Sequence, residues 1–183
     1  MTKFLLPFML LAALGLLLSF AAHLSALLGM TLPGGPLVWS LHAGIFVVWL
    51  PTVLVANKMT AGSNRRDFWK VALSGCPAWM RQALYILFAY AVLNFIFFML
   101  TTAGHAKSDG VVTPAVIRGF SGHWMIFYGA AFATLYSAIQ SPALLRQQKC
   151  PNGHPVSAAD KFCPLCGRPL DRTDVSNKAS VSP

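Results

Sequence analysis

Four long apolar stretches, separated by short polar segments, dominate the pattern of this chain. They cover about residues 4–28, 37–56, 82–103 and 123–145, and no Lys, Arg or Asp interrupts any of them. Each is close to the ~20 residues that a helix needs to cross a bilayer at about 1.5 Å per residue. The pattern therefore predicts an all-α membrane protein, in which residues 1–148 form a four-helix transmembrane bundle.

The first stretch has a second interpretation, as a signal peptide, because Lys3 precedes it and small residues follow. Its apolar run is longer than the roughly 7–15 residues of a usual signal-peptide core, and no small-x-small motif closes it. We therefore expect it to remain in the protein as a helix.

Composition supports the membrane assignment. The chain is 56% hydrophobic and 10% charged, and it contains no Glu, whereas a soluble domain has roughly 25% charged residues. The net charge of +9 raises the question of nucleic-acid binding, but the positions of the charges indicate topology instead. With a cytoplasmic N-terminus, the outer side holds only Lys107 and Arg118 of the 14 basic residues. The positive-inside rule then predicts that both termini are cytoplasmic, in a bacterial inner membrane, with the inner charges facing anionic lipid.

A compact ligand cluster lies near the end of the chain, in the run KCPNGHPVSAADKFCPLCGRPL. Three thiols and one imidazole in a C-x3-H, C-x2-C arrangement supply four tetrahedral ligands for zinc. The cluster predicts a structural zinc site, closed by four protein ligands, in residues 149–170, and thiolate ligands need the reducing compartment that the predicted topology gives them. The ligands are Cys150, His154, Cys163 and Cys166.

Each half of this motif has a glycine, Gly153 before His154 and Gly167 after Cys166, that allows the tight turn of a zinc knuckle. The pattern CPNGH…KFCPLCG resembles short zinc ribbons that are appended to many unrelated prokaryotic proteins. The resemblance covers Lys149 to Leu170 only and implies metal binding without implying an activity. The usual first knuckle of such ribbons is C-x2-C, and here His154 takes the second position. A redox dithiol formed by Cys163 and Cys166 alone is the other interpretation.

Histidines gather toward the outer face of the predicted bundle. His23 and His42 lie about five residues inside the first and second spans, while His105 and His123 flank the third and fourth. Gly15, Ser19 and His23 share one helix face, so we expect His23 to point into the bundle. An ionisable residue in a membrane is a functional candidate. His23 and His42 could be axial ligands of a haem, or three of the four histidines could hold a metal ion. Alternatively, His23 and His42 hydrogen-bond each other, Ser25, Ser40 or the backbone.

Several further positions carry local predictions. Ser63 or Asn64 caps a short surface helix that contains Phe68 and Trp69, and Ser121 caps the fourth span. Small residues recur at every fourth position of that span and predict close packing, within the bundle or across a dimer; they are Gly129, Ala133, Ser137 and Ser141. Asn94 is expected to hold helices together, and most of the five tryptophans are expected to be interfacial anchors.

These observations favour a non-enzymatic inner-membrane protein whose zinc ribbon docks a protein partner at the cytoplasmic face. The runner-up is a haem- or metal-binding redox or metal-handling protein that uses the outer histidines. A small transporter is less favoured, because no internal symmetry supports it. Membrane lipid is an expected partner, nucleic acid is not, and a homo-oligomer is left open. Residues 171–183 are polar, lack aromatic residues and are expected to be a disordered tail.

Overall fold

The computed structural model describes residues 4–30, 35–61, 63–103, 112–145, 148–156 and 160–170. The expectations for His105 and for the tail 171–183 lie outside these described residues.

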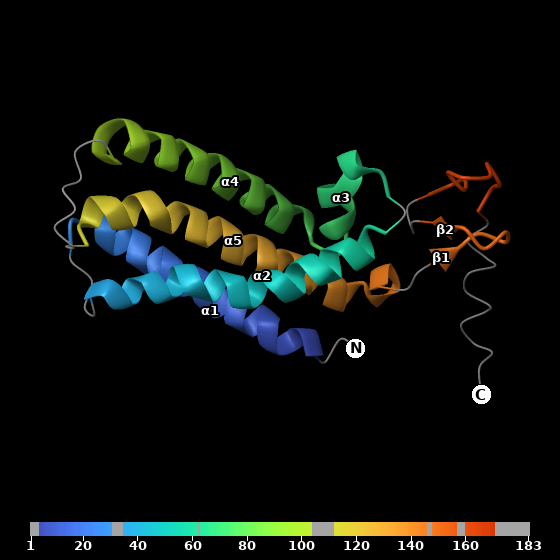
Figure 1. Ribbon diagram of the computed structural model, residues 1–183, viewed down its shortest axis with the longest axis horizontal. Helices are drawn as coiled ribbons and strands as arrows, with labels where there is room; N and C mark the ends of the chain where they lie inside the picture. The colour runs from blue at the N-terminus through green and yellow to red at the C-terminus, as the bar shows by residue number, and fades with distance from the viewer. Residues whose placement is uncertain are drawn as a thin grey trace.

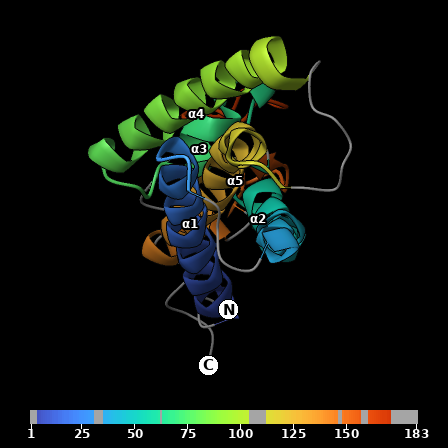
Figure 2. The ribbon, with the colours of Figure 1, turned by 90° about the vertical axis from the view of Figure 1, so that its left-hand side faces the viewer.

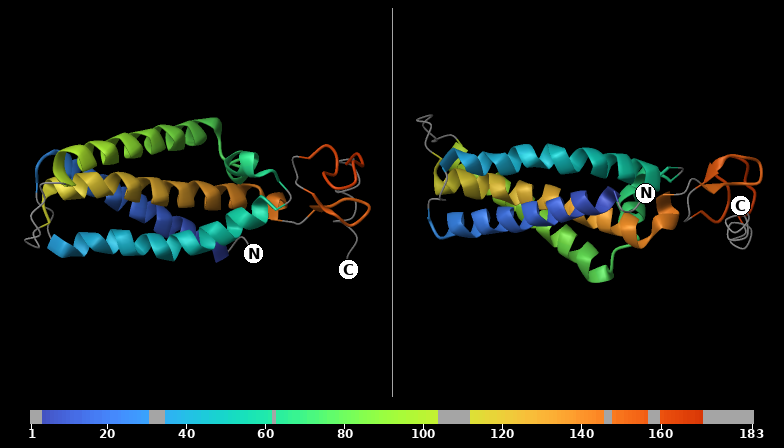
Figure 3. Two further views of the ribbon diagram at one scale, coloured as in Figure 1. Left: turned by 45° about the horizontal axis from the view of Figure 1, so that its top comes forward. Right: turned by 90° about the horizontal axis from the view of Figure 1, so that it is seen from below.

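Four long helices form an antiparallel bundle in which successive helices run in opposite directions (Figure 1). A 3₁₀ turn, Gly35–Trp39, leads into the second helix, and a π turn, Met99–Ala103, continues the third. Figure 3 shows the same alternation from two further sides. The helices are α1 (Leu5–Leu27), α2 (Ser40–Met59), α4 (Ala78–Phe98) and α5 (Pro114–Gln140).

In the part of the chain that the structure describes, three helical segments are long and apolar enough to cross a membrane: Leu5–Leu27, Gly35–Met59 and Ala78–Thr101. They correspond to the first three predicted spans, and they make the mostly helical fold compatible with a membrane protein. Their large apolar side chains are widely exposed, as on Leu17, Leu54 and Ile86. Surface of this kind is suited to lipid and not to water.

The fourth predicted span, residues 123–145, overlaps α5, which starts earlier than that span, at Pro114, and ends at Gln140. This helix lies at the centre of the bundle, between α1, α2 and α4 (Figure 2). Its buried faces carry many small residues, among them Gly119, Gly122 and Ala131. A central helix of this kind contacts protein on most sides, so it needs less apolar surface than its neighbours.

The predicted cap of the fourth span is wrong. Ser121 lies inside the helix and does not cap it, because Thr113 is the N-cap: its Oγ1 accepts from the Val116 N–H at 3.4 Å. Pro114 then occupies the first turn, where its missing N–H has no cost. Trp124 is fully buried in the core and is not an interfacial anchor.

The end of the bundle near the N-terminus carries the remaining elements. Asn64 caps a 3₁₀ turn, Arg65–Asp67, as predicted, and the short helix α3 (Phe68–Ala72) follows it. Beyond the bundle, β1 (Gln148–Lys149) and β2 (Pro155–Val156) pair antiparallel, with Gln148 opposite Val156. Figure 3 shows this C-terminal segment projecting past the same end at which the chain begins.

Candidate metal centre

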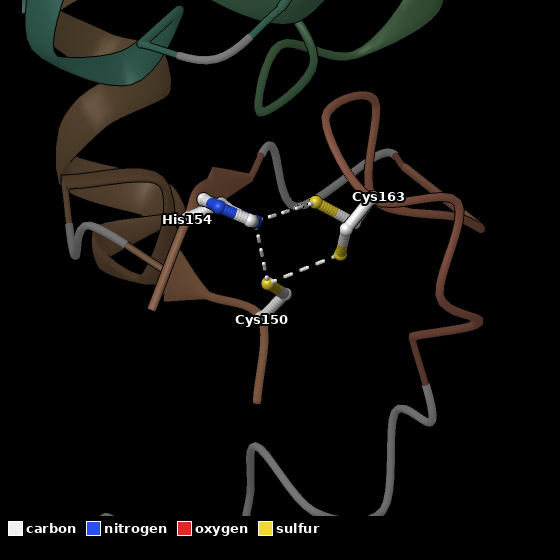
Figure 4. A group of neighbouring side chains, drawn as sticks. Cys150, His154 and Cys163 are labelled. Atoms are coloured by element: carbon white, nitrogen blue, oxygen red, sulfur yellow. Dashed lines mark hydrogen bonds between the residues drawn. The ribbon is translucent and has the colours of Figure 1, made fainter. Parts of the chain in front are cut away.

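The four predicted ligands come together in the C-terminal segment. Their ligand atoms, one from each of Cys150, His154, Cys163 and Cys166, all lie within 4.8 Å of one another. Figure 4 shows the first three of these side chains converging on one point. Among the described residues, this is the one group of three or more His, Cys, Asp or Glu side chains placed to share a metal ion.

The spacing of these atoms matches a tetrahedral zinc site. The Sγ of Cys150 lies 3.6 Å from Nδ1 of His154 and 3.9 Å from Sγ of Cys166, and the Sγ of Cys163 lies 3.8 Å from Nδ1 of His154. Two thiolates bound to Zn²⁺ at about 2.3 Å in tetrahedral geometry are about 3.8 Å apart, and a thiolate and an imidazole nitrogen are about 3.6 Å apart. The donor set and its separations are therefore consistent with zinc.

Two glycine-closed turns hold the ligands. The N–H of Gly153 donates to the Cys150 carbonyl, and the N–H of Gly167 donates to the Cys163 carbonyl, both at 2.8 Å. Gly153 has φ +83° and Gly167 has φ +68°, a left-handed conformation that glycine adopts without strain. The predicted knuckle turns are therefore present.

Backbone amides also favour the thiolate form of Cys163. Burial of Cys163 opposes its ionisation, but the N–H groups of Leu165 and Cys166 that point at its Sγ lower the pKa of this thiol to about 6. Hydrogen bonds to a charged thiolate favour that charged form. Arg168 ties the two turns together, because its Nη1 donates to Oδ1 of Asn152 at 3.1 Å.

The segment has little core of its own. Among its described side chains, the buried ones are Cys150, Val156 and Cys163, with Leu170 packed partly against them. Two of these three are ligands. A segment of this size buries too little apolar surface to fold unaided, so a bound metal would supply much of its stability.

The histidines of the long helices form a separate feature of the bundle. His23 is buried, as the small-residue face of α1 predicted, and its ring bonds two side chains from other helices. Nδ1 lies 2.7 Å from Oγ of Ser121 on α5, and Nε2 bonds the hydroxyl of Tyr90 on α4. Ser121 in turn donates to the Arg118 carbonyl at 3.3 Å. This sequence of bonds assigns the ring proton to Nδ1, so that Tyr90 donates to Nε2.

His42 has a different partner. The indole N–H of Trp124 donates to Nδ1 of His42 at 3.0 Å. Since an indole N–H can only donate, Nδ1 is an acceptor and the proton of a neutral ring lies on Nε2. The ring of His42 also lies edge-to-face on His123, with 5.5 Å between ring centroids.

The structure thus separates the two proposed axial histidines into different hydrogen-bond networks. Among the described residues, the side-chain partners of these two rings are Ser121, Tyr90 and Trp124. The partners expected from the sequence, which were Ser25, Ser40 or the other histidine, are not among them. A haem or metal ligand needs a free nitrogen lone pair, and each ring would have to break one of these bonds to offer one. The sequence analysis did not find the partners Tyr90, Ser121 and Trp124. The one signal available was spacing: Ser121 and Trp124 are three residues apart on α5, and so lie next to each other on one helix face.

Other predicted packing positions are occupied as expected. The small-residue stripe of α5 packs within the bundle, where Ser137 Oγ accepts from the Gly75 N–H at 2.9 Å and Ala133 O accepts from the Cys76 thiol at 3.1 Å. Asn94 donates to the Arg118 carbonyl at 2.7 Å.

Comparison with known proteins identifies no relative: no family model, no curated protein and no solved structure matches the chain significantly. The likeness of Lys149–Leu170 to short zinc ribbons therefore rests on the ligand residues and their spacing.

Proposed function

We propose that this chain is a four-span inner-membrane protein whose C-terminal segment, residues 149–170, is a zinc ribbon that docks a protein partner at the cytoplasmic face. The observation that carries the proposal is the convergence of four metal-ligand atoms within 4.8 Å, on two glycine-closed turns beyond the end of the bundle. This arrangement is a small, rigid unit attached to a membrane anchor.

The length and position of α5 support a fourth crossing. Its 27 residues extend about 40 Å at 1.5 Å per residue, enough for the ~30 Å hydrocarbon layer. The helix lies among three apolar helices of membrane length. Arg118 is near its first turn, and the guanidinium lies over the ring of Phe97, 5.0 Å from the centroid. A cation close to a helix end can reach the interface from there.

Charge supports a cytoplasmic position for the ribbon. Five basic residues lie in the connection between α2 and α4 or in the helix ends that flank it, at the same end of the bundle as the ribbon; they are Lys58, Arg65, Arg66, Lys70 and Arg81. Connections rich in Lys and Arg stay in the cytoplasm. Thiolate ligands also persist in that reducing compartment.

Zinc would act in the ribbon as a structural ion. Cys150, His154, Cys163 and Cys166 would fill all four positions, which leaves none for water or substrate and gives the site no catalytic opening. The protein itself positions the ligands. The two turns hold them in place, and the antiparallel pairing of β1 with β2 closes the loop that carries Cys150 and His154.

An exposed apolar pair on the ribbon supports docking. Phe162 is 61% exposed and Leu165 is 68% exposed, on either side of the buried Cys163. Lys161 and Arg168 are exposed nearby in the sequence. Large apolar residues with a polar rim are typical of protein contacts, and the basic rim favours a partner segment that carries acidic residues.

A photocrosslinker at position 165 tests docking in intact membranes. With p-benzoylphenylalanine in place of Leu165, we expect one discrete protein adduct that Cys163→Ser abolishes. Cys76→Ser, which removes a thiol from the bundle, is the matched control and should leave the adduct unchanged. An adduct that is still formed in the Cys163→Ser variant, or crosslinks to lipid alone, would contradict the docking proposal.

Alkaline phosphatase fusions test the topology separately, since the enzyme is active only outside the cytoplasm. We expect activity when it follows residue 103 and none when it follows residue 61 or residue 170. Activity after residue 170 would contradict the fourth crossing.

A further inference from the structure

The connection between α2 and α4, together with the first turn of α4, presents a basic, aromatic surface at the inner end of the bundle. Residues 57–81 contain one acidic residue, Asp67, against five basic ones. Asp67 pairs with Lys70 at 3.9 Å, and both side chains are largely exposed, so this ion pair neutralises little at the surface. We name as the basic shelf the residues Arg65, Arg66, Trp69, Lys70, Trp79 and Arg81.

One side of this connection is fixed to the bundle. Leu73 is buried, the Gly75 N–H donates to Ser137 Oγ at 2.9 Å, and the Cys76 thiol donates to the Ala133 carbonyl. A Cβ on Gly75 would lie 2.5 Å from the Ser137 carbonyl oxygen, so α5 is in backbone contact with the connection. The segment between Lys70 and Trp79 is therefore held against α5.

The other side faces away from the protein. Trp69 is 43% exposed and Trp79 is 67% exposed, while Arg65 and Arg66 are exposed beside the Asn64 cap. Trp79 is the second residue of α4, an apolar helix of membrane length. Tryptophan at such a position lies at the level of the lipid headgroups.

We propose that the basic shelf binds the headgroups of anionic phospholipids in the inner leaflet. Lys and Arg supply charge complementarity to the phosphate, and the two indole rings lie at the boundary where headgroup and acyl chain meet. An acidic protein segment is the other candidate occupant. The lipid fits better, because a water-soluble segment has no access to the ring of Trp79 at the edge of the hydrocarbon layer. This inference rests on the membrane topology of the proposed function and not on docking by the ribbon.

Native mass spectrometry of the full chain tests the proposal, with phosphatidylglycerol and phosphatidylcholine offered in equal amounts. We expect the unaltered chain to retain phosphatidylglycerol preferentially. Each cationic side chain near a membrane surface contributes about a fivefold factor, so Arg65→Gln with Arg66→Gln should lower the preference by about 5- to 25-fold. Lys70→Gln with Arg81→Gln should do the same, and this second pair guards against a folding defect in the first.

The matched control removes two charges from the ribbon instead, as Lys149→Gln with Lys161→Gln. It should leave the lipid preference unchanged. An equal loss in the control, no preference in the unaltered chain, or retention of a polyglutamate peptide in place of lipid would overturn the proposal. The shelf variants leave the ribbon unaltered, and the docking test uses ribbon residues only. Lipid binding by the shelf and docking by the ribbon can therefore fail independently of each other.

Discussion

Trp124 and His42 join the central helix to α2 through a hydrogen bond of 3.0 Å from the indole N–H to Nδ1. The indole is fully buried, and its ring also packs edge-to-face on Trp39, with 5.6 Å between centroids. One side chain thus supplies both a polar and an apolar contact between α5 and the segment that begins α2.

Trp124→Phe is expected to destabilise the bundle. The substitution removes the N–H donor, leaves Nδ1 of His42 without its partner and opens space in a filled core. Interhelical hydrogen bonds contribute about 0.6 kcal/mol in membranes, and the lost ring volume adds to this, so we expect a loss of about 1–3 kcal/mol. The measurement is the free energy of unfolding by denaturing detergent. Trp79→Phe, at an exposed ring, is the control and should change it by less than about 0.5 kcal/mol. Equal losses in the two variants would contradict the assigned packing.

Gly15→Ala should also be destabilising, because Gly15 lies directly against the ring of Tyr128. An added Cβ would overlap ring carbons of Tyr128, and that ring is held by its hydroxyl, which donates to the Leu41 carbonyl at 2.8 Å. Overpacking of this kind costs about 1–3 kcal/mol. The effect should shrink when Tyr128→Ala is present, which a double-mutant cycle of unfolding free energies measures. Additive effects would show that the two residues do not touch.

Cys76 should react slowly with iodoacetamide in the folded protein at neutral pH. Burial raises the pKa of this thiol, and only the thiolate is nucleophilic. A raised pKa means that the thiolate fraction at pH 7–8.5 is below that of a free cysteine, and that it grows only at higher pH. Peptide mass spectrometry after timed alkylation follows the rate. In detergent-unfolded protein the rate should return to that of a free cysteine; an equally fast reaction in the folded state would contradict burial.

Some features of the fold are readable from local sequence. The face of α1 that carries Gly15, Ser19 and His23 was predicted to point inward, and all three residues are buried. Four-residue spacing of small side chains is sufficient for that inference, because it depends on one helix alone. The cluster of Cys150 with its three partner ligands was likewise predicted, since metal-ligand residue types and spacing are local.

Other features depend on which helices are neighbours, and the sequence does not specify that. The hydrogen-bond partners of His23 are Tyr90 and Ser121, which lie 67 and 98 residues away along the chain. Trp124 resembles an interfacial anchor by its position in the predicted span, and it becomes a core residue because α5 lies between the other three helices. The fourth span was predicted to begin at residue 123, whereas α5 begins at Pro114 and includes Gly119 and Gly122. The structure packs both glycines closely, against Phe98 and against Asn94 and Ala91.

The most direct test of the account is the zinc content of purified protein, measured by elemental analysis together with an absorption spectrum. We predict one zinc per chain, which Cys150→Ser or Cys163→Ser removes and Cys76→Ser leaves in place, with no visible absorption band. Absence of zinc from the unaltered chain, or equal zinc in the Cys163→Ser variant, would contradict the metal centre. A haem band that disappears with substitution of His23 or His42 would move the active centre to the outer histidines.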